Sequence, residues 1–286
     1  MYYLFIPLMC ILASSKAMIQ SRFAKNMTKT PVDALVFNGI VFVVTALFGA
    51  LSLFKGIDLP TLVAGSIFGF ASVCFQLFYV EAFSTGPVSM TVLVVNSGMM
   101  IPILVSHFLY HEALTPNRII GIIITLFAFY FACGRGQEEK VNGKWLFFLV
   151  LAFLTNNTAT ITQKIYTNSF DSLNPSAFVP VSYLSALLMT AVVVWVMHLR
   201  GVRTSFRFGP KAAGTAGAVG AILGTYQLIS LRAVKMIDGT ILYPLCNGGT
   251  TLISTLASTI LFRERLSRRQ KISVVLGITA IVLMSI

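Results

Sequence analysis

Long apolar runs separated by short polar gaps make up most of the chain. Residues 120–133 and 186–197, for example, contain no charged side chain. A helix needs about 20 mostly apolar residues to cross a hydrocarbon core that is about 30 Å thick. A membrane β-barrel would instead show segments of about ten residues with alternating polarity, whereas these runs are continuously apolar. The pattern predicts ten membrane-spanning helices, at residues 3–21, 34–54, 61–83, 88–110, 117–134, 145–165, 176–198, 211–233, 239–262 and 270–286.

The second half of the chain repeats the first, with an offset of 142 to 152 residues. Apolar sequence matches itself easily, so the polar matches carry the evidence, because polar side chains are rare inside a bilayer. The informative pairs are Gln76 with Gln227, Asn96 with Asn247, Glu112 with Glu264, Arg22 with Lys164 and, among small residues, Gly69 with Gly220.

Each half contains five predicted helices, over residues 1–137 and 138–286. Because five is odd, the second half enters the membrane from the opposite side, which makes the halves inverted repeats. Such repeats recur in secondary transporters, whose substrate site lies near the midplane where the repeats meet. The expected fold is therefore an all-α polytopic membrane protein whose ten transmembrane helices form two inverted five-helix repeats.

Composition agrees with a membrane protein and excludes the soluble classes. Of the 286 residues 56% are hydrophobic and 10% are charged, where a soluble chain carries about 25% charged residues. The mean hydropathy is +0.85. A net charge of +12 would suggest nucleic-acid binding in a soluble protein. Here the cations lie in short gaps, as in cytoplasmic loops that face an anionic leaflet, and we expect no nucleic-acid partner.

The distribution of Lys and Arg predicts the orientation. Fifteen of the 21 basic residues lie in gaps after odd-numbered helices, and five lie in gaps after even-numbered helices. The positive-inside rule places the basic gaps in the cytoplasm. We therefore expect a multi-pass protein of the plasma (inner) membrane with both termini outside.

The ends of the two halves share a motif that resembles a known family. The segments are GPVSMTVLVVNSGMMIPILVSHFLYHEALTPNRIIG and DGTILYPLCNGGTTLISTLASTILFRERLSRRQKISVVLG. Each has a short loop, a Gly- or Pro-containing helix, a Glu after an aromatic or basic residue, and a closing apolar helix. With the five-plus-five helices, these segments resemble the drug/metabolite transporter superfamily, in particular its EamA-like members.

The resemblance implies a transporter, since members of similar sequence carry amino acids, other metabolites or drugs. The small four-helix relatives in the superfamily couple protons and cations through a Glu in their first helix. Neither the first nor the sixth predicted helix of this chain contains Asp or Glu. Efflux of cationic drugs through that residue is therefore not expected here.

Paired amides near the centres of the spans are the strongest candidates for a substrate site. Gln76 and Gln227 lie deep in the third and eighth predicted helices, and Asn96 and Asn247 lie in the fourth and ninth. An amide offers donors and an acceptor, so a pair from opposite halves could hold the polar group of a substrate. The alternative is hydrogen bonding between helices, worth about 1 kcal/mol per bond.

The first and sixth predicted helices add further polar residues. Asn156 and Asn157 align with Ser14 and Ser15 between the halves. A helix facing lipid would not carry such residues, so these faces must point to protein or water. We expect Ser15, Asn156 and Asn157 to line a cavity.

Three tyrosines adjoin these polar positions and are included in the candidate site. They are Tyr79, Tyr226 and Tyr243. Their rings could shape an amphipathic pocket or stack on a cation. Most aromatic residues in membrane helices simply pack, which is the alternative.

Glu81 is the only acidic residue within a predicted span, about one turn from a helix end. An ionisable group in a span usually faces a cavity or a partner, and Glu81 is therefore the candidate for proton or ion coupling. The alternative is a carboxylate that faces the lipid headgroups. His107 and His111 share a helix face but lack a clear third ligand, so we expect no metal site and no cofactor.

No catalytic motif such as HExxH, GxSxG or a P-loop occurs, and we do not expect an enzyme. The sequence predicts a secondary transporter that moves a small polar or amphipathic metabolite, with an amino-acid-like solute favoured, by alternating access. The alternatives are a lipid-linked substrate carrier or flippase of the same superfamily and a non-transporting membrane scaffold. The expected partners are a small-molecule substrate, the lipid bilayer and, in a homodimer, a second copy.

Overall fold

The structure is a bundle of helices, and no strand occurs in the residues it describes. The computed structural model describes residues 4–27, 31–86, 88–132, 142–170, 174–202, 209–262 and 268–285. The elements are α1 (Phe5–Met27), α2 (Pro31–Leu47), α3 (Ala50–Leu53), α4 (Leu59–Thr85), α5 (Val88–Ser97), α6 (Met100–Tyr110), α7 (Pro116–Ala132), α8 (Gly143–Ser169), the 3-10 turn η2 (Pro175–Ala177), α9 (Phe178–Leu199), α10 (Pro210–Met236), α11 (Gly239–Phe262) and α12 (Arg268–Ser285).

In their described residues all ten segments predicted as spans are helical, but two are interrupted. The segment 34–54 forms α2 and the one-turn α3, with a turn at residues 48–49 between them. The segment 88–110 forms α5 and α6, with a turn at residues 98–99. A Cβ atom at Gly98 would lie 2.6 Å from Nδ2 of Asn157, so this turn brings the backbone directly against α8.

Among the described residues, five helical segments are long and apolar enough to cross a membrane, namely Leu59–Ala82, Thr91–Tyr110, Gly143–Ser169, Pro175–Leu199 and Pro210–Met236. Shorter apolar helices cover Phe5–Gln20, Val32–Leu47 and Pro116–Phe131. Large apolar side chains such as Phe70, Leu188 and Trp195 are more than half exposed, while the polar Asn38 and Gln227 are buried. Apolar outside and polar inside is the pattern of a protein that crosses the bilayer several times.

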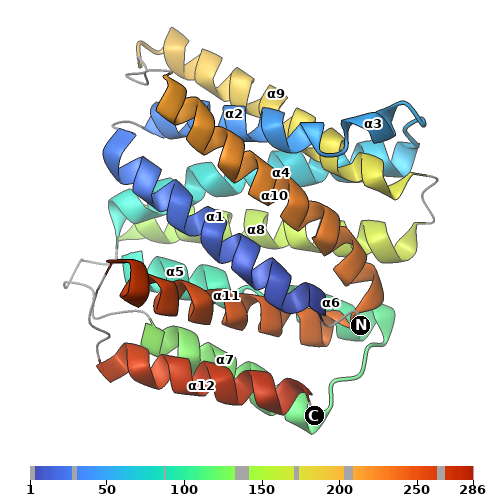
Figure 1. Ribbon diagram of the computed structural model, residues 1–286, viewed down its shortest axis with the longest axis vertical. Coiled ribbons are helices and arrows are strands. Elements are labelled where there is room, and N and C mark those ends of the chain that lie inside the picture. The colour runs from blue at the N-terminus through green and yellow to red at the C-terminus, as the bar shows by residue number, and fades with distance from the viewer. Residues whose placement is uncertain are drawn as a thin grey trace.

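The most extensive contacts join helices from different halves of the chain (Figure 1). α4 packs along α8 and α9, and α10 packs along α1 and α2. In addition, α2 packs on α9 and α7 packs on α12. The two ends of the chain lie at one end of the bundle, together with α3 and the C-terminal ends of α8 and α10 (Figure 1). We call this the α3 end.

Two glycines mark close approaches between helix backbones. A Cβ atom on Gly69 of α4 would lie 2.2 Å from the carbonyl oxygen of Ser182 on α9. A Cβ atom on Gly220 of α10 would lie 2.6 Å from Cβ of Val44 and 2.9 Å from the carbonyl oxygen of Val41, both on α2. Small residues allow this kind of packing in membrane bundles. The two glycines are also a matched pair in the sequence repeat.

Gly69→Val and Gly220→Val should each lower the melting temperature of the detergent-solubilised protein. The added side chains would collide with the facing helices, and overpacking of this kind costs about 1–3 kcal/mol. Gly214→Val, also on α10, is the control, because nothing lies within 4 Å of a Cβ atom there. If all three variants had the same melting temperature, the close approach of α4 to α9 and of α10 to α2 would be refuted.

Candidate functional site

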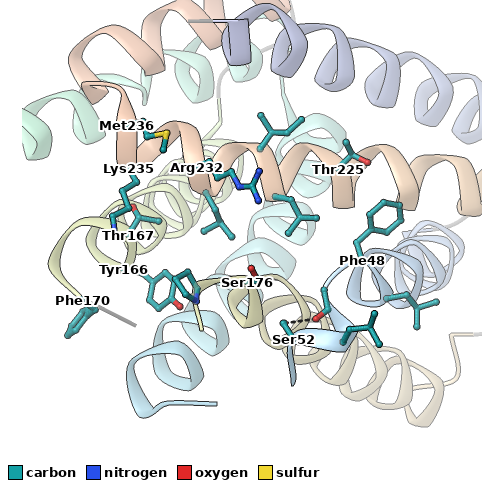
Figure 2. Close-up of a pocket in the computed structure, with 17 residues that line it drawn as sticks. Phe48, Ser52, Tyr166, Thr167, Phe170, Ser176, Thr225, Arg232, Lys235 and Met236 are labelled. Atoms are coloured by element: carbon teal, nitrogen blue, oxygen red, sulfur yellow. Dashed lines mark hydrogen bonds between the residues drawn. The ribbon is translucent and has the colours of Figure 1, made fainter. Parts of the chain in front are cut away.

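A cavity of about 750 Å³ lies at the α3 end of the bundle (Figure 2). Its walls are the corner between α2 and α3, the end of α8 with η2, and one face of α10. Small-molecule pockets have volumes of about 300–1,000 Å³. The first wall belongs to the first half of the chain and the others to the second half, so the cavity lies between the halves.

The α10 wall follows from helical spacing. Thr225, Leu228, Ile229, Arg232 and Met236 line the cavity, and residues three or four positions apart share a helix face. This face changes from a hydroxyl at Thr225 through aliphatic side chains to a cation at Arg232.

The opposite walls add aromatic rings and further hydroxyls. Phe48 and Ser52 come from the α2–α3 corner, Tyr166 comes from α8, and Ser176 comes from η2 (Figure 2). The hydroxyl group of Tyr166 is hydrogen-bonded to that of Thr61 on α4, with 2.7 Å between the oxygens. The cavity is therefore amphipathic, with a mainly apolar surface and a few polar groups.

A buried ion pair joins the two halves at the same end of the bundle. Nζ of Lys164, on α8, lies 2.5 Å from Oε1 of Glu112, and the two side chains are 1% and 9% exposed. The ammonium group also lies 5.3 Å from the ring centroid of Tyr110. Oε2 of Glu112 accepts the backbone N–H of Thr240 at 3.2 Å. His111, with φ 53°, ends α6 in a left-handed conformation immediately before Glu112. The carboxylate therefore links the end of α6 to α8 and α11.

A second charged contact connects the start of α7 to the start of α11. Nη1 of Arg118 donates to Oδ2 of Asp238 at 3.1 Å and to Oγ1 of Thr240 at 3.0 Å. It also donates to the carbonyl oxygen of Ala113 at 2.6 Å. Two charged contacts, Glu112–Lys164 and Arg118–Asp238, thus join the two halves at this end.

The predicted glutamines are both engaged with other helices. Asn38 of α2 donates to Oε1 of Gln76 at 2.6 Å and accepts from Gln20 at 2.9 Å. Nε2 of Gln227 donates to the hydroxyl oxygen of Tyr183 on α9 at 2.9 Å. Within the described ranges no hydrogen bond joins Gln76 to Gln227, and helical geometry places Gln227 on the side of α10 away from the cavity.

The other predicted polar residues are dispersed along the bundle. Asn157 is buried, and its Nδ2 donates to the carbonyl oxygen of Phe153 at 2.7 Å. Four side chains are half-buried and form no hydrogen bond in the part of the chain that the structure describes, namely Ser15, Asn96, Asn156 and Asn247. Their polar groups are therefore not committed to neighbouring helices.

The three predicted tyrosines occupy different environments. The ring centroid of Tyr79 lies 5.0 Å from that of Phe75 on the same helix. Tyr226 packs between the two large apolar clusters of the core. The hydroxyl groups of Tyr243 and Ser106 are buried without a hydrogen-bond partner among the described residues, and both side chains flank Gly239. None of the predicted site residues lines the cavity.

Glu81 lies near the C-terminal end of α4, at the opposite end of the bundle from the cavity. Its carboxylate is 3.8 Å from Nζ of Lys144, and the Glu81 side chain is 41% exposed. It also accepts a hydrogen bond from the hydroxyl of Ser84 at 3.1 Å. Of the two glutamates, Glu112 is the more deeply buried.

The histidines considered as metal ligands lie at the end of α6. Nδ1 of His107 is 2.8 Å from the carbonyl oxygen of Glu112. Over the described residues, no group of three or more His, Cys, Asp or Glu side chains could hold a metal ion.

Sequence reasoning missed the charged residues at the α3 end. In the sequence, Glu112 and Lys164 are matched positions of the repeat, and Arg232 and Lys235 are basic residues of the gaps after even-numbered helices. The repeat contains a signal for Glu112 and Lys164, because it pairs Glu112 with Glu264 and Lys164 with Arg22. Glu264, the counterpart of Glu112, lies outside the described residues. No such signal marked Arg232 or Lys235, since their place in the cavity depends on how α10 packs against α2.

Similarity to known proteins agrees with this fold. A relative from Haemophilus influenzae, described as an uncharacterized protein, is 22% identical over 190 residues, which cover 64% of this chain and 62% of the relative. The alignment thus spans less than two-thirds of that relative's length. A protein of known crystal structure superposes with a TM-score of 0.78 over 99% of this chain and 97% of its own, at 17% identity, which shows the fold alone.

A further similarity, to a family of transporters, covers slightly less than half of the chain. Residues 2–134 match the EamA-like transporter family. These residues include α1 to α7 and the α2–α3 corner that forms one wall of the cavity. Over these residues the chain is similar to the EamA-like transporter family, which is part of the drug/metabolite transporter superfamily.

Proposed function

We propose that the protein is a secondary transporter, and not an enzyme, that moves a small polar or amphipathic solute by alternating access. The observation that carries the proposal is the cavity of about 750 Å³, walled by both halves of the chain at one end of the bundle. A carrier that is open to one side presents a cavity of this kind between its repeats. An amino-acid-like solute suits the mixture of apolar, hydroxyl and charged groups in the walls.

We also propose that residues 1–137 and 138–286 are inverted repeats whose ten helical segments each cross the membrane. The helix contacts support this division because they are reciprocal. The third predicted span of the first half lies in α4, which packs on α8 and α9, the helices of the first two predicted spans of the second half. The third helix of the second half, α10, packs on the first two helices of the first half, α1 and α2. A pseudo-two-fold axis between the halves would generate this exchange.

The proposed orientation places the α3 end, with both termini and the cavity, on the outer face of the plasma (inner) membrane. The gaps richest in Lys and Arg connect helices at the other end of the bundle, and the positive-inside rule assigns such gaps to the cytoplasm. The cavity would then open outward. Glu81 would lie at the cytoplasmic end, where its proposed role in ion coupling can be tested by Glu81→Gln.

Ligand-dependent melting of the purified protein tests the proposed function. The panel comprises amino acids, nucleosides, amines and organic acids. A ligand at 100 times its dissociation constant stabilises the folded state by about 2.7 kcal/mol, which is measurable as a rise in melting temperature. A flat response across the panel would contradict the small-solute proposal and favour a lipid-linked substrate or a scaffold role.

Thr225→Trp should remove the ligand-dependent rise in melting temperature. Thr225 faces the cavity near Phe48, so an indole ring at this position would occupy space that a solute needs (Figure 2). Thr215→Trp is the matched control, because Thr215 lies near the start of the same helix and outside the cavity. If Thr215→Trp lost the ligand-dependent rise in melting temperature and Thr225→Trp kept it, the binding site would lie outside the cavity.

A further inference from the structure

Among the described residues that line the cavity, two are cations and none is acidic. Arg232 and Lys235, near the end of α10, are both among its lining residues, and none of the others is Asp or Glu. Figure 2 shows both side chains projecting from α10 toward the wall that contains Tyr166 and Ser176. In the described part of the chain neither Arg232 nor Lys235 forms an ion pair.

Three acidic side chains are described at this end of the bundle, and all three are already engaged. Glu112 is paired with Lys164, and Asp238 is paired with Arg118. Asp58 accepts the backbone N–H of Thr61 at the start of α4. The described residues therefore supply no free carboxylate to the cations of the cavity. Two neighbouring like charges beside a low-dielectric wall create a field that attracts an anion.

The chemistry of the two cations specifies the kind of anion. A guanidinium group forms paired, parallel hydrogen bonds with a carboxylate or phosphate, and an ammonium group adds a second charge. Phe48, Leu228 and Ile229 provide an apolar surface in the same cavity. The complementary ligand has an oxyanion at one end and an apolar body.

We propose that the cavity binds amphipathic molecules through an oxyanion, a carboxylate or a phosphate, held by Arg232 and Lys235. This assignment rests on the proposed transport function and narrows its solute class from polar or amphipathic to anionic amphipathic. An amino-acid-like solute meets the requirement through its carboxylate. A lipid headgroup phosphate has the same chemistry, and the test below separates the two sources.

A matched pair of probes isolates the charge. 3-Phenylpropionate and 3-phenylpropionamide have the same apolar body and differ in the charge of the terminal group. Binding is measured on the full chain in phosphatidylcholine nanodiscs. The carboxylate should bind at least ~10-fold more tightly than the amide, because charge-assisted hydrogen bonds are much stronger than neutral ones. Equal binding of the two probes, or binding of neither, would overturn the assignment.

Removal of the two cations should abolish this preference. In the double variant Arg232→Gln, Lys235→Gln the two probes should bind alike, and each single variant should lose part of the preference. Both residues are exposed, so these variants should melt like the wild type. Lys55→Gln is the control, since Lys55 is also exposed at the α3 end but does not line the cavity. A preference that survives in the double variant would refute the role of these cations.

Lipid competition and transport complete the test. If added phosphatidylglycerol weakens binding of 3-phenylpropionate to the wild type, the oxyanion site also accepts headgroups; if it has no effect, the site is selective for solutes. Binding and transport of the amide in preference to the carboxylate would refute the oxyanion site and leave the transport function standing. Charge-selective binding without transport of any bound solute would refute the transport function and leave the oxyanion site standing.

Discussion

Lys164→Met should lower the free energy of unfolding by about 3–5 kcal/mol, since it leaves a buried carboxylate without its cation. The Lys164 and Glu112 side chains are only 1% and 9% exposed, so solvent cannot replace the lost partner. Glu112 would have to take up a proton or leave its contact with the N–H of Thr240. The loss is measured by denaturation of the purified protein in mixed detergent micelles.

A second Lys–Glu pair, which joins α8 to α4, provides the control. Lys144 lies 3.8 Å from Glu81, but these side chains are 63% and 41% exposed, and exposed pairs contribute about 0–1 kcal/mol. Lys144→Met should therefore melt close to the wild type. The double variant Lys164→Met, Glu112→Gln should recover much of the lost stability, because it removes both buried charges and keeps an acceptor for Thr240. A small effect of Lys164→Met would contradict the burial of this pair.

The double variant Gln76→Ala, Gln227→Ala should abolish transport while the protein remains folded. Each glutamine reaches the second helix of its own half, through Asn38 on α2 or Tyr183 on α9. Interhelical hydrogen bonds in membranes contribute about 0.6–2 kcal/mol each, which is too little for their loss to unfold the protein. Transport should be lost because these amides would bind the polar group of the solute when the halves rearrange. The measurements are solute uptake by proteoliposomes and the melting temperature.

Gln163→Ala separates this role from simple helix fastening. Gln163 is also buried and donates to Oγ of Ser230 on α10 at 3.0 Å, but it is not one of the paired amides. The Gln163→Ala variant should lose a similar free energy of unfolding per hydrogen bond and keep its transport activity. Normal uptake by the Gln76, Gln227 double variant would show that these residues only hold helices together.

The helices were largely predictable because apolar runs and their flanking residues define them. The segment 239–262 coincides with α11, which begins after Asp238. The turn at residues 98–99 was not predicted, because the apolar residues on both sides of Asn96, Ser97 and Gly98 favoured one continuous span. At this turn Gly98 lies directly against Asn157 of α8, and this close approach is a feature of tertiary packing. The first helix was predicted to end at residue 21 but continues to Met27, since a helix can extend beyond the apolar part of its sequence.

The candidate site was less predictable than the helices. Polarity within a span identified Gln76 and Gln227 as buried hydrogen-bonding residues, but their bonding partners depend on which helices become neighbours. Glu112 follows the end of α6, a position that usually faces water, and its burial depends on the arrival of α8 and α11. The cavity is formed by three segments that are distant in sequence, so no local pattern could place Arg232 in its wall.

Solute exchange in proteoliposomes tests directly whether the protein is a transporter. The solute that gives the largest rise in melting temperature is loaded unlabelled inside the vesicles, and a trace of labelled solute is added outside. We expect saturable, ATP-independent entry of label into vesicles that contain the wild-type protein, with entry strongly reduced by Thr225→Trp and retained in Thr215→Trp. Entry no faster than into protein-free vesicles, for a folded protein that binds the solute, would contradict the transport function.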